Sequence, residues 1–498
     1  ELWVARFGNS AIDVPSDIKV DTSGNVYVTG TSNITLDSIY EVGGDYTTIK
    51  YNSSGTQQWI VYYGFGDTSE ERVAATALDD SGNVYVTGYI HREVNGNVTI
   101  THSDFGTIKY NTNGVKQWIA IYNSSANNDD EAIALAVDKS GNVFVAGNSL
   151  DSVGRSGCAT IKYNSLGEQQ WISKYDDGRV VALGIHPSGD VYVLGDSFGD
   201  FATIKYDSTG QEKWVAKYSL QYSSSHPSAL VVDLLGNVIV TGTADRYECS
   251  VCQTSLISST VKYNSSGVQQ WVARFDSTYA TSSAVAIDSF GNVYITGSSE
   301  CFRSGKFGYG PFVGGNYGTI KYDPNGVQQW ITRYNGFGKL IVTGAAQNIE
   351  VDKLGNSYVA GNDSIQYIMK YNSKGEVLWR ALDTSGNIYS KFKFLFVDSA
   401  GNVYISGIYR TNMYNTAGVQ QWNVQYSQNY PFQYNYFSPN AATVDGKGNV
   451  YVTGKFNSYI TTVKYNSAGK QQWAIGYHET DDDEAYDLTV DRSGNVYV

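Results

Sequence analysis

Clustered carboxylates are the residues of this sequence best suited to bind a metal ion. Two acidic runs stand between predicted strands, and their candidate ligands are Asp129, Asp130, Glu131, Asp481, Asp482 and Asp483. Calcium favours several oxygen ligands held close together, so either run could bind Ca²⁺. Neither run has the ligand spacing of an EF-hand loop, so solvated acidic loops are the preferred interpretation. Apart from possible Ca²⁺, we predict no cofactor.

A single aspartate also recurs at one point of an internal repeat, three residues before a glycine. These residues are Asp21, Asp79, Asp138, Asp288, Asp352, Asp398 and Asp491. Brought together, they could form a ring of metal ligands. Aspartate at the start of a tight turn also accepts hydrogen bonds from backbone N–H groups further along that turn. Because each aspartate precedes a Gly-Asn pair, we predict turn capping.

Four cysteines, Cys158, Cys249, Cys252 and Cys301, are expected in or beside connections on one face of the fold. Only one pair has C-x-x-C spacing, so a four-cysteine zinc site is weakly supported. In an exported protein, disulfides such as Cys249–Cys252 or Cys252–Cys301 are the commoner outcome. The sequence leaves the pairing open.

The remaining candidates are histidines and aromatic residues. The five histidines have neither a metal-ligand spacing nor a partner carboxylate at a repeat position, so we predict no catalytic residues. They are His91, His102, His186, His226 and His478. Phe307, Tyr309 and Phe312 stand among glycines and could stack on sugar rings or dock another protein. Folding back over their own strands is an equal alternative.

Two linked motifs, repeated about ten times, must position these residues. They approximate A-x-x-V-D-x-S-G-N-V-Y-V-T-G and T-I-K-Y-N-S-x-G-x-Q-Q-W-x-x-x-Y. The glycine of the first motif recurs ten times from Gly24 to Gly494, on average about every 52 residues, a spacing typical of propeller blades. All ten tryptophans occupy one repeat position, at Trp3, Trp59, Trp118, Trp171, Trp214, Trp271, Trp330, Trp379, Trp422 and Trp473.

Each repeat reads as four short strands, a to d. Residues 284–287 are typical of strand a, 292–296 of strand b, 107–110 of strand c and 269–275 of strand d. The a–b and c–d turns carry Asp or Asn early and Gly where a positive φ is needed. Strand b has Val on one face and Tyr on the other, which indicates a sheet covered on both faces, as in a blade packed between two others.

These motifs resemble the SBBP β-propeller repeat, and the resemblance covers essentially the whole chain. G-N-V-Y-V-T-G followed by T-I-K-Y-N-x-x-G-x-Q-Q-W carries it. The resemblance implies an all-β propeller of the kind found in secreted and surface proteins of bacteria and some archaea. It implies no shared catalytic set.

The chain, residues 1–498, is thus predicted to be one propeller array with nine complete blades and a split tenth. An open superhelical array of blades and two smaller propellers are the alternatives. The split blade takes strand d from residues 1–8 and strands a and b from 485–498, and we expect its missing strand to follow in a longer chain or to come from another copy. The complete blades cover approximately 16–65, 73–124, 130–177, 179–219, 227–276, 282–335, 346–383, 392–427 and 440–478.

Charge and loop pattern define the expected function. The net charge of −13 disfavours a nucleic-acid partner, and no apolar run is long enough for a membrane-spanning helix. The b–c connections, long at 31–46, 89–106, 243–259 and 298–318 and short near 196–201 and 455–460, open on one face, where binding usually occurs.

We therefore expect an extracellular or cell-surface structural and adhesive protein without enzymatic activity. Its expected partners are other copies of itself, surface proteins or glycans, and it could assemble into larger arrays or filaments. A carbohydrate- or protein-binding module is the first alternative, and a propeller enzyme acting on polysaccharide is the second.

Overall fold

A computed structural model of the chain describes most of the repeat units. The residues that it describes are 12–21, 23, 25–37, 40–42, 44–52, 54, 56–64, 71–91, 102–197, 199–219, 223–247, 254–276, 281–299, 302–303, 312–313, 316–334, 345–362, 366–382, 392–398, 401–407, 410–425, 437–445, 447–456, 459–477, 485, 488–490 and 496–498.

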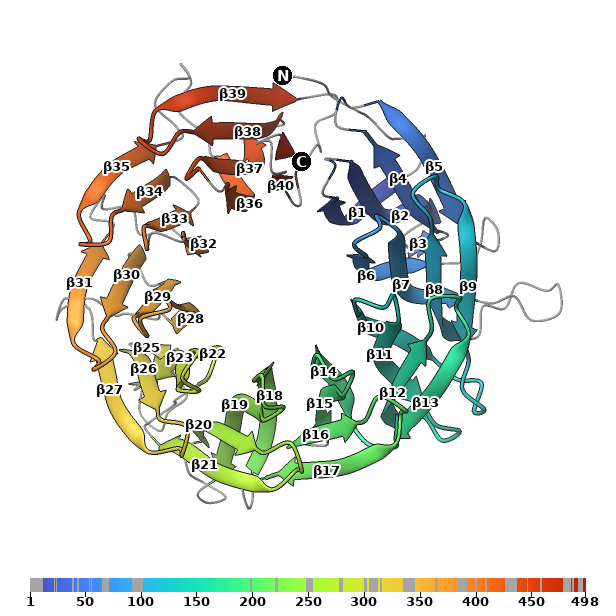
Figure 1. Ribbon diagram of the computed structural model, residues 1–498, viewed down its shortest axis with the longest axis horizontal. Helices are drawn as coiled ribbons and strands as arrows, with labels where there is room; N and C mark the ends of the chain where they lie inside the picture. The colour runs from blue at the N-terminus through green and yellow to red at the C-terminus, as the bar shows by residue number, and fades with distance from the viewer. Residues whose placement is uncertain are drawn as a thin grey trace. The chain divides into compact units, whose positions relative to one another are not determined.

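The described residues form strands and turns, and no helix occurs among them. No part of this described chain therefore offers a helix that could cross a membrane. The strands form nine four-stranded antiparallel sheets, each with its strands in sequence order, as expected for propeller blades (Figure 1). The predicted class, an all-β propeller with nine complete blades, is confirmed.

The four principal strands of each blade follow one another in the order a, b, c, d. In blades 1 to 3 they are β1 (Ile12–Val20), β2 (Val26–Asp37), β4 (Asp45–Tyr51) and β5 (Gln57–Tyr63); β6 (Arg72–Leu78), β7 (Val84–His91), β8 (Ser103–Tyr110) and β9 (Lys116–Tyr122); β10 (Asp130–Val137), β11 (Val143–Leu150), β12 (Ser156–Tyr163) and β13 (Gln169–Tyr175). In blades 4 to 6 they are β14 (Arg179–Ile185), β15 (Val191–Ser197), β16 (Asp200–Tyr206) and β17 (Glu212–Tyr218); β18 (Ser223–Val232), β19 (Val238–Tyr247), β20 (Thr254–Tyr263) and β21 (Gln269–Asp276); β22 (Ala284–Ile287), β23 (Val293–Ser299), β26 (Asn316–Tyr322) and β27 (Gln328–Tyr334).

The last three blades continue the same order. They are β28 (Ala345–Val351), β29 (Ser357–Asn362), β30 (Gln366–Tyr371) and β31 (Val377–Leu382); β32 (Phe392–Val397), β33 (Val403–Gly407), β34 (Arg410–Tyr414) and β35 (Gln420–Gln425); β36 (Phe437–Val444), β37 (Val450–Phe456), β38 (Tyr459–Tyr465) and β39 (Gln471–Tyr477). The hairpin β40 (Thr489–Val490) and β41 (Val496–Tyr497) follows.

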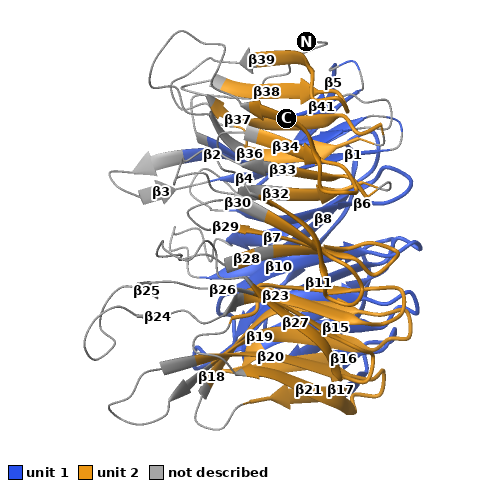
Figure 2. Ribbon diagram, turned by 90° about the vertical axis from the view of Figure 1, so that its left-hand side faces the viewer, with its two compact units in different colours: residues 1–195, 205–213, 486–498 blue, residues 196–204, 214–485 orange. Residues whose placement is uncertain are grey.

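The chain divides into two compact units (Figure 2). Unit 1 comprises residues 1–195, 205–213 and 486–498, and unit 2 comprises residues 196–204 and 214–485. Blades 1 to 3 and the β40–β41 hairpin belong to unit 1, and blades 5 to 9 belong to unit 2. The strands of blade 4 are divided between the two.

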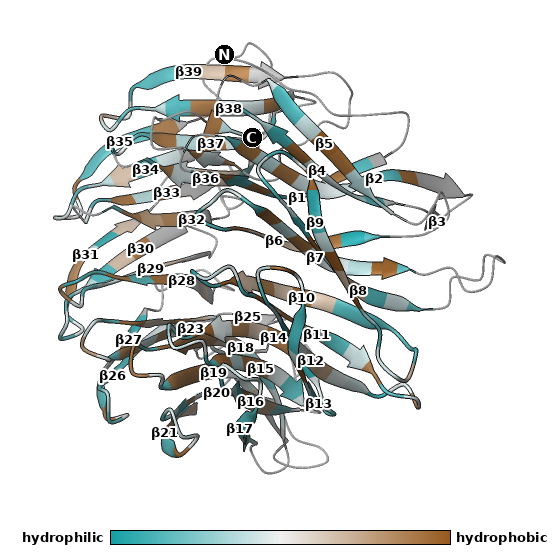
Figure 3. Cartoon of the chain, turned by 45° about the vertical axis from the view of Figure 1, so that its right-hand side comes forward, coloured by the Kyte–Doolittle hydropathy of each residue, from teal (hydrophilic) through white to brown (hydrophobic). Residues whose placement is uncertain are grey.

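The core of each unit lies between consecutive blades, because strand b is buried on both faces. In β7, Val84, Tyr85 and Val86 are all fully buried although they point alternately to opposite sides. Val84 and Val86 pack with Tyr27 of the preceding blade, whereas Tyr85 packs with Val143 of the following one. Figure 3 shows the hydrophobic stretches running along the strands. One face of the blade is therefore buried by the preceding blade and the other by the following blade.

A β-bulge in strand a explains the glycine that ends the V-T-G motif. In blade 2 the register of β6 against β7 shifts between Val73 and Ala75. The bulge moves the strand a backbone toward β7, and a Cβ on Gly88 would lie 1.9 Å from the Arg72 carbonyl oxygen. Only glycine fits opposite such a bulge.

The predicted long b–c connections are shorter in the structure, because strands b and c continue to pair beyond the repeat motif. The predicted loop 31–46 contains the end of β2, the extra strand β3 (Tyr40–Val42) and the start of β4. The other three long connections are shortened in the same way by extensions of β7 and β8, β19 and β20, and β23 and β26, and the last also holds β24 (Phe302–Arg303) and β25 (Phe312–Val313). An antiparallel ladder needs only backbone groups to propagate, so the loop bounds were wrong. The short connections near 196–201 and 455–460 are confirmed.

The predicted a and b strands of the split tenth blade are present as β40 and β41. Tyr497 is buried and packs in unit 1 against Ile18, Val26 and Tyr51 of blade 1. The hairpin thus covers the open face of blade 1, as a preceding blade would. Strand d of this split blade, residues 2–7, lies outside the described residues.

The nine tryptophans in the described parts of the chain all lie in strand d, as predicted. Five of them are buried, namely Trp171, Trp271, Trp330, Trp379 and Trp422. The other four, Trp59, Trp118, Trp214 and Trp473, are partly buried.

Truncation of one such tryptophan should open a junction between two blades. Trp271 is 8% exposed and packs with Ile239 and Val293 of two adjacent blades, so we expect Trp271→Ala to lower the free energy of unfolding by about 3–5 kcal/mol. Trp271→Phe keeps most of the apolar contact and should cost less. Denaturant titration monitored by circular dichroism measures both, and an Ala variant as stable as the wild type would contradict the assigned packing.

Candidate functional site

The recurring aspartate of strand a caps its own a–b turn. In blade 2, Asp79 Oδ1 accepts hydrogen bonds from the backbone N–H groups of Ser81 at 3.0 Å and Asn83 at 2.9 Å, and its Oδ2 accepts one from Asn83 Nδ2 at 2.7 Å. The two contacts with the asparagine four positions on recur at Asp21, Asp138, Asp233, Asp288, Asp352, Asp398 and Asp445. Turn capping is confirmed for the predicted aspartates, apart from Asp491, which lies outside the described residues.

The tyrosine of strand b completes this turn and reaches the next one. Tyr294 Oη lies 3.0 Å from Asp288 Oδ2 in its own turn and 3.0 Å from the Gly355 carbonyl oxygen in the next blade. Tyr27 makes the equivalent contacts to Asp21 and Gly82. Burial raises the pKa of Tyr294 well above its usual value, and the carboxylate of Asp288 raises it further. The phenol therefore stays protonated, as a hydrogen-bond donor must.

The tryptophan of strand d binds the c–d turn of the following blade. Trp271 Nε1 donates a hydrogen bond of 3.0 Å to the Pro324 carbonyl oxygen. Its indole lies against Gly326, where φ is +80° and an added Cβ would meet Trp271 Cγ at 2.3 Å. Seven more tryptophans make the same hydrogen bond, at Trp59, Trp118, Trp171, Trp214, Trp330, Trp379 and Trp422.

The lysine of strand c reinforces this contact, a role that the sequence did not reveal. Lys321 Nζ and Trp330 Nε1 both lie 3.1 Å from the Ser373 carbonyl oxygen, and the ammonium group lies 5.1 Å from the centre of the Tyr294 ring. Burial lowers the pKa of Lys321, and Asp288 partly opposes this effect. Equivalent bonds to the next turn come from Lys50, Lys109, Lys162, Lys262 and Lys370.

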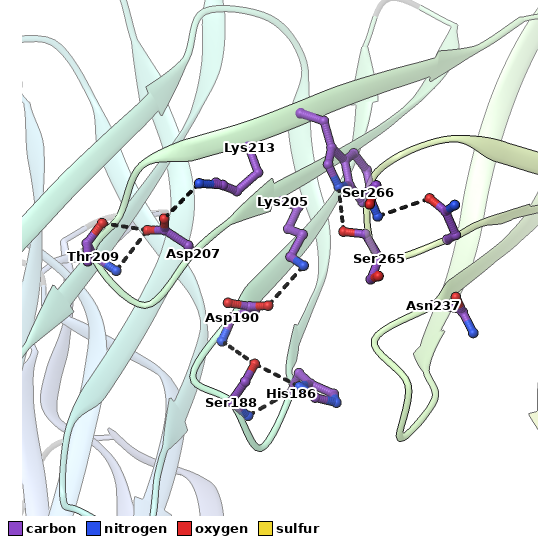
Figure 4. Close-up of polar contacts among 12 residues, drawn as sticks. His186, Ser188, Asp190, Lys205, Asp207, Thr209, Lys213, Asn237, Ser265 and Ser266 are labelled. Atoms are coloured by element: carbon purple, nitrogen blue, oxygen red, sulfur yellow. Dashed lines mark hydrogen bonds and ion pairs between the residues drawn. The ribbon is translucent and has the colours of Figure 1, made fainter.

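Blade 4 departs from this pattern, because a histidine and a serine meet at its a–b turn as they would in a catalytic site (Figure 4). His186 replaces the capping aspartate, and its Nδ1 lies 2.8 Å from Ser188 Oγ. The same nitrogen accepts the Ser188 backbone N–H at 3.2 Å, as an aspartate oxygen would. Asp190 supplies the missing carboxylate and pairs with the buried Lys205 at 2.9 Å. The His–Ser contact is therefore a substituted turn cap.

The c–d turn of blade 4 shows how far such a cap can lower the pKa of a carboxyl group. Asp207 accepts hydrogen bonds from the hydroxyl of Thr209 at 2.6 Å and from its N–H at 2.9 Å, and Lys213 Nζ lies 3.2 Å away. The Thr209 hydroxyl, together with these partners, holds the pKa of Asp207 at about 2. Asp207 therefore caps the turn in its ionised form.

A cavity of about 320 Å³ lies in unit 1 between the a–b turns of blades 2 and 3. Asp79, Asp138, Lys109 and Ser165 line it. Asp79 and Asp138 cap their turns, and Lys109 Nζ donates to the Ser165 carbonyl oxygen at 3.1 Å. These three charged side chains are engaged in the turns, so the cavity is a by-product of blade packing.

The predicted calcium ligands of blade 3 do not converge. Asp130 is buried, and its Oδ2 accepts the Ser124 N–H at 2.6 Å, whereas Glu131 is exposed. Asp129 accepts the Ser103 N–H at 3.0 Å. Asp130 and Glu131 are successive residues of β10 and point to opposite sides of the sheet, which separates their carboxylates. Within the described ranges no three His, Cys, Asp or Glu side chains are grouped for a metal. Asp481, Asp482 and Asp483 lie outside those ranges.

Cys158 is a free, buried thiol in β12 rather than a disulfide partner in a loop. Its Sγ lies 3.9 Å from the Asp177 carbonyl oxygen and close to Gly195 of the next blade. Burial raises its pKa to about 12, and Asp177 adds to the effect. A small apolar side chain suits this tight contact between blades, which explains why its assignment as a disulfide candidate was wrong. Cys249, Cys252 and Cys301 lie outside the described residues.

Two histidines have carboxylate partners that the sequence did not predict. His226 Nδ1 lies 3.2 Å from Asp196 Oδ2 in unit 2, and His102 Nδ1 lies 3.8 Å from Asp129 Oδ1 in unit 1. Each pair joins consecutive blades on the side of the b–c connections. Ser225 precedes His226 within β18, so its buried hydroxyl lies on the opposite face of the strand. The pairs thus tie blades together without forming a Ser-His-Asp triad.

The predicted aromatic binding residues are only partly placed. Phe307 and Tyr309 lie outside the described residues, and Phe312 begins the short strand β25 between β23 and β26. The binding prediction for them stays a prediction.

The strands and turns define a propeller built from blades that interlock through four recurring residue types. The chain carries SBBP repeats: the family model described as "Beta-propeller repeat" matches residues 2–36 and 270–300. The second match runs from β21, strand d of blade 5, through β22 and β23, strands a and b of blade 6, and the described part of the first match covers β1 and most of β2. A propeller with SBBP repeats fits a surface or binding protein.

Comparison with known proteins adds only distant similarities. No curated protein matches the chain. A structure described as "Crystal structure of the eukaryotic initiation factor" is 9% identical, with 87% of this chain and 94% of that chain covered and a TM-score of 0.48. The "Dos1 propeller" is 11% identical (78% and 90% covered, TM-score 0.42), and AztD of Citrobacter koseri is 13% identical (75% and 93% covered, TM-score 0.35). Such similarities carry no functional information.

Alanine at a c–d turn glycine should show how much the indole contact contributes. Gly326 and Gly154 both have φ +80° in turns of the same type, but a Cβ on Gly154 would meet nothing within 4 Å. Gly154→Ala should cost about 1–2 kcal/mol for the left-handed backbone, and Gly326→Ala should cost clearly more because its Cβ collides with Trp271. Equal losses in unfolding free energy would show that the indole does not constrain the turn.

Stability should fall at acidic pH through the turn caps. Burial alone would raise the pKa of Asp79, but hydrogen bonds from Asn83, Tyr85 and Ser81 outweigh it and leave the pKa below its usual value. Because the pKa of Asp79 is lower in the folded than in the unfolded chain, its ionised carboxylate stabilises the fold above pH about 4. This contribution is lost as the pH falls through the pKa of the folded state. Unfolding free energies measured from pH 7 to pH 2 should therefore decline less steeply in Asp79→Asn than in wild type. Asp80→Asn, in the same turn, is the control and should follow the wild type.

Proposed function

We propose that this chain is a non-enzymatic scaffold of an extracellular or cell-surface protein that presents binding loops on a rigid propeller. The observation that carries the proposal is the use of the recurring polar side chains. Asp79, Tyr294, Lys321 and Trp271, each typical of its repeat position, are engaged in turns or blade junctions.

The structural use of the recurring polar groups among the described residues supports a scaffold over a catalyst. An enzyme site needs a nucleophile, base or metal directed at one point with room for substrate. In the part of the chain that the structure describes, the one histidine–serine contact, His186–Ser188, replaces a turn cap. The described cavity is lined by groups that fix turns.

The two ends of the blades differ, and this difference supports binding at the loop end. The a–b and c–d turns repeat one hydrogen-bonding pattern at every described blade. The b–c connections vary from the two residues between β15 and β16 to the long segment between β23 and β26, which contains Phe307, Tyr309 and Phe312. Variable connections on a rigid base are where binding residues concentrate, and exposed aromatic side chains suit sugars or proteins.

Binding to surface components tests the proposal. We expect the immobilised full chain to retain polysaccharides or proteins extracted from the cell envelope of its source organism. The variant Phe307→Ala/Tyr309→Ala/Phe312→Ala should lose about tenfold or more in affinity, as expected for aromatic anchors. Val115→Ala/Leu166→Ala, which changes exposed apolar residues at the opposite end of the blades, should bind as the wild type does.

Two further measurements accompany this experiment. Polysaccharides incubated with the chain should keep their length, and a membrane-impermeant label should reach the protein on intact cells. Shortened polysaccharide would identify an enzyme, and labelling only after lysis would contradict the surface location.

A further inference from the structure

Three consecutive a–b turns of unit 2 present large apolar side chains to solvent. Leu234 and Leu235 in blade 5 are 86% and 78% exposed, Phe290 in blade 6 is 70% exposed and Leu354 in blade 7 is 78% exposed. We call these four residues the apolar turn patch. At the position before the turn glycine, the other seven repeats have small or polar residues, namely Ser23, Ser81, Ser140, Ser188, Ala400, Lys447 and Ser493.

The fold does not require these apolar side chains. The backbone N–H of Phe290 donates to Asp288 Oδ1 at 2.9 Å, and that of Leu354 donates to Asp352 Oδ1 at 2.9 Å. Ser81 makes the same bond to Asp79 at 3.0 Å. Since serine serves the turn equally well, the exposed leucines and phenylalanine contribute nothing to folding that would offset their contact with water.

A direct contact joins the turns of blades 6 and 7, and a shared core joins blades 5 and 6. The Tyr294 hydroxyl lies 3.0 Å from Asp288 in the turn of Phe290 and 3.0 Å from Gly355 in the turn of Leu354. Blades 5 and 6 share a core, and Val231 and Ile287, which lie shortly before their turns, pack around the same cluster. The three turns therefore stand at the same end of three consecutive blades that pack on one another.

Mixed charges and further apolar residues surround the patch at the same end of the blades. The c–d turns add Val268 and Val327, each 58% exposed. Lys353, Lys374 and Glu376 are exposed in these a–b and c–d turns. An apolar centre with a polar rim is the arrangement of a protein interface. The same turns also carry Asp233, Asp288, Asp323 and Asp352, so basic residues are not in excess and the rim does not attract anionic lipid. A rim with both signs of charge can pair with itself.

We propose that the apolar turn patch is a self-association surface at which two copies of this chain meet face to face. A two-fold contact brings the same patch from both copies together, so Leu234, Leu235, Phe290 and Leu354 bury one another. Lys353 or Lys374 of one copy can then face Glu376 of the other. This contact is independent of binding at the loop end, which stays free on both copies.

Mass measured against concentration tests the proposal. Light scattering and sedimentation velocity on the full chain, from about 1 to about 100 μM, should show a monomer that becomes a dimer. The variant Leu234→Ser/Leu235→Ser/Phe290→Ser/Leu354→Ser should raise the dissociation constant about tenfold or more and keep its melting temperature. Val115→Ser/Leu166→Ser, equally apolar and exposed at 57% and 70% in unit 1, should dimerise like the wild type.

Added salt and lipid vesicles distinguish an apolar contact between two copies from binding to lipid. Added sulfate should strengthen the dimer, because it favours apolar burial and screens the repulsion between two acidic chains. Phe290→Asp, which places like charges at the centre, gives a second variant that should abolish it. Monomers of wild type throughout the concentration range, or dimers unaffected by both variants, would overturn the proposal. Patch-dependent binding to phosphatidylcholine vesicles without any dimer would overturn it in favour of a lipid partner.

Discussion

The contact between each indole and the turn glycine of the following blade is the constraint on which the rest of the structure depends. A single blade buries neither face by itself, and each face becomes interior only when a neighbouring blade is fixed at the right distance. The Trp271 N–H reaches the Pro324 carbonyl only because Gly326 has no side chain and adopts a positive φ. The K-Y-N-x-x-G run and the Q-Q-W run are therefore two halves of one joint, which explains why they recur together.

This joint determines where variation is possible. The turn end of each blade is occupied by carboxylate caps, tyrosine hydroxyls and buried lysines, so a substitution there must be compensated nearby. Blade 4 illustrates such compensation, because the loss of the capping aspartate at His186 accompanies a new carboxylate at Asp190 that pairs with Lys205. The b–c connections differ in length from blade to blade. Exposed side chains at the turn tips, such as Phe290, are also free to change because only their backbone serves the turn.

The repeat pattern of the sequence predicted the features that depend on interactions between residues near one another in the chain. Strand positions, tryptophans on strand d and aspartate caps followed from periodicity and turn chemistry. Contacts between blades could not be predicted in this way. Lys321 reads as an ordinary strand residue, yet its partner is Ser373 in the next repeat, and the His226–Asp196 pair likewise joins two blades. The loop bounds at 31–46 were wrong because β2 and β4 pair beyond the motif, and Cys158 was misassigned because its burial depends on Gly195 of a neighbouring blade. The candidate binding face rests on loop length alone, so the sequence could place a binding surface but not its ligand.

Hydrogen exchange at the tryptophan side chains tests the interlocking of the blades most directly. In a spectrum of ¹⁵N-tryptophan-labelled chain, the eight indole N–H groups that donate to turn carbonyls should exchange slowly, and their protection should fall together when one joint is opened. Indole N–H groups that exchange at the rate of free tryptophan under native conditions would contradict the account, because the blades would then be held by something other than this contact.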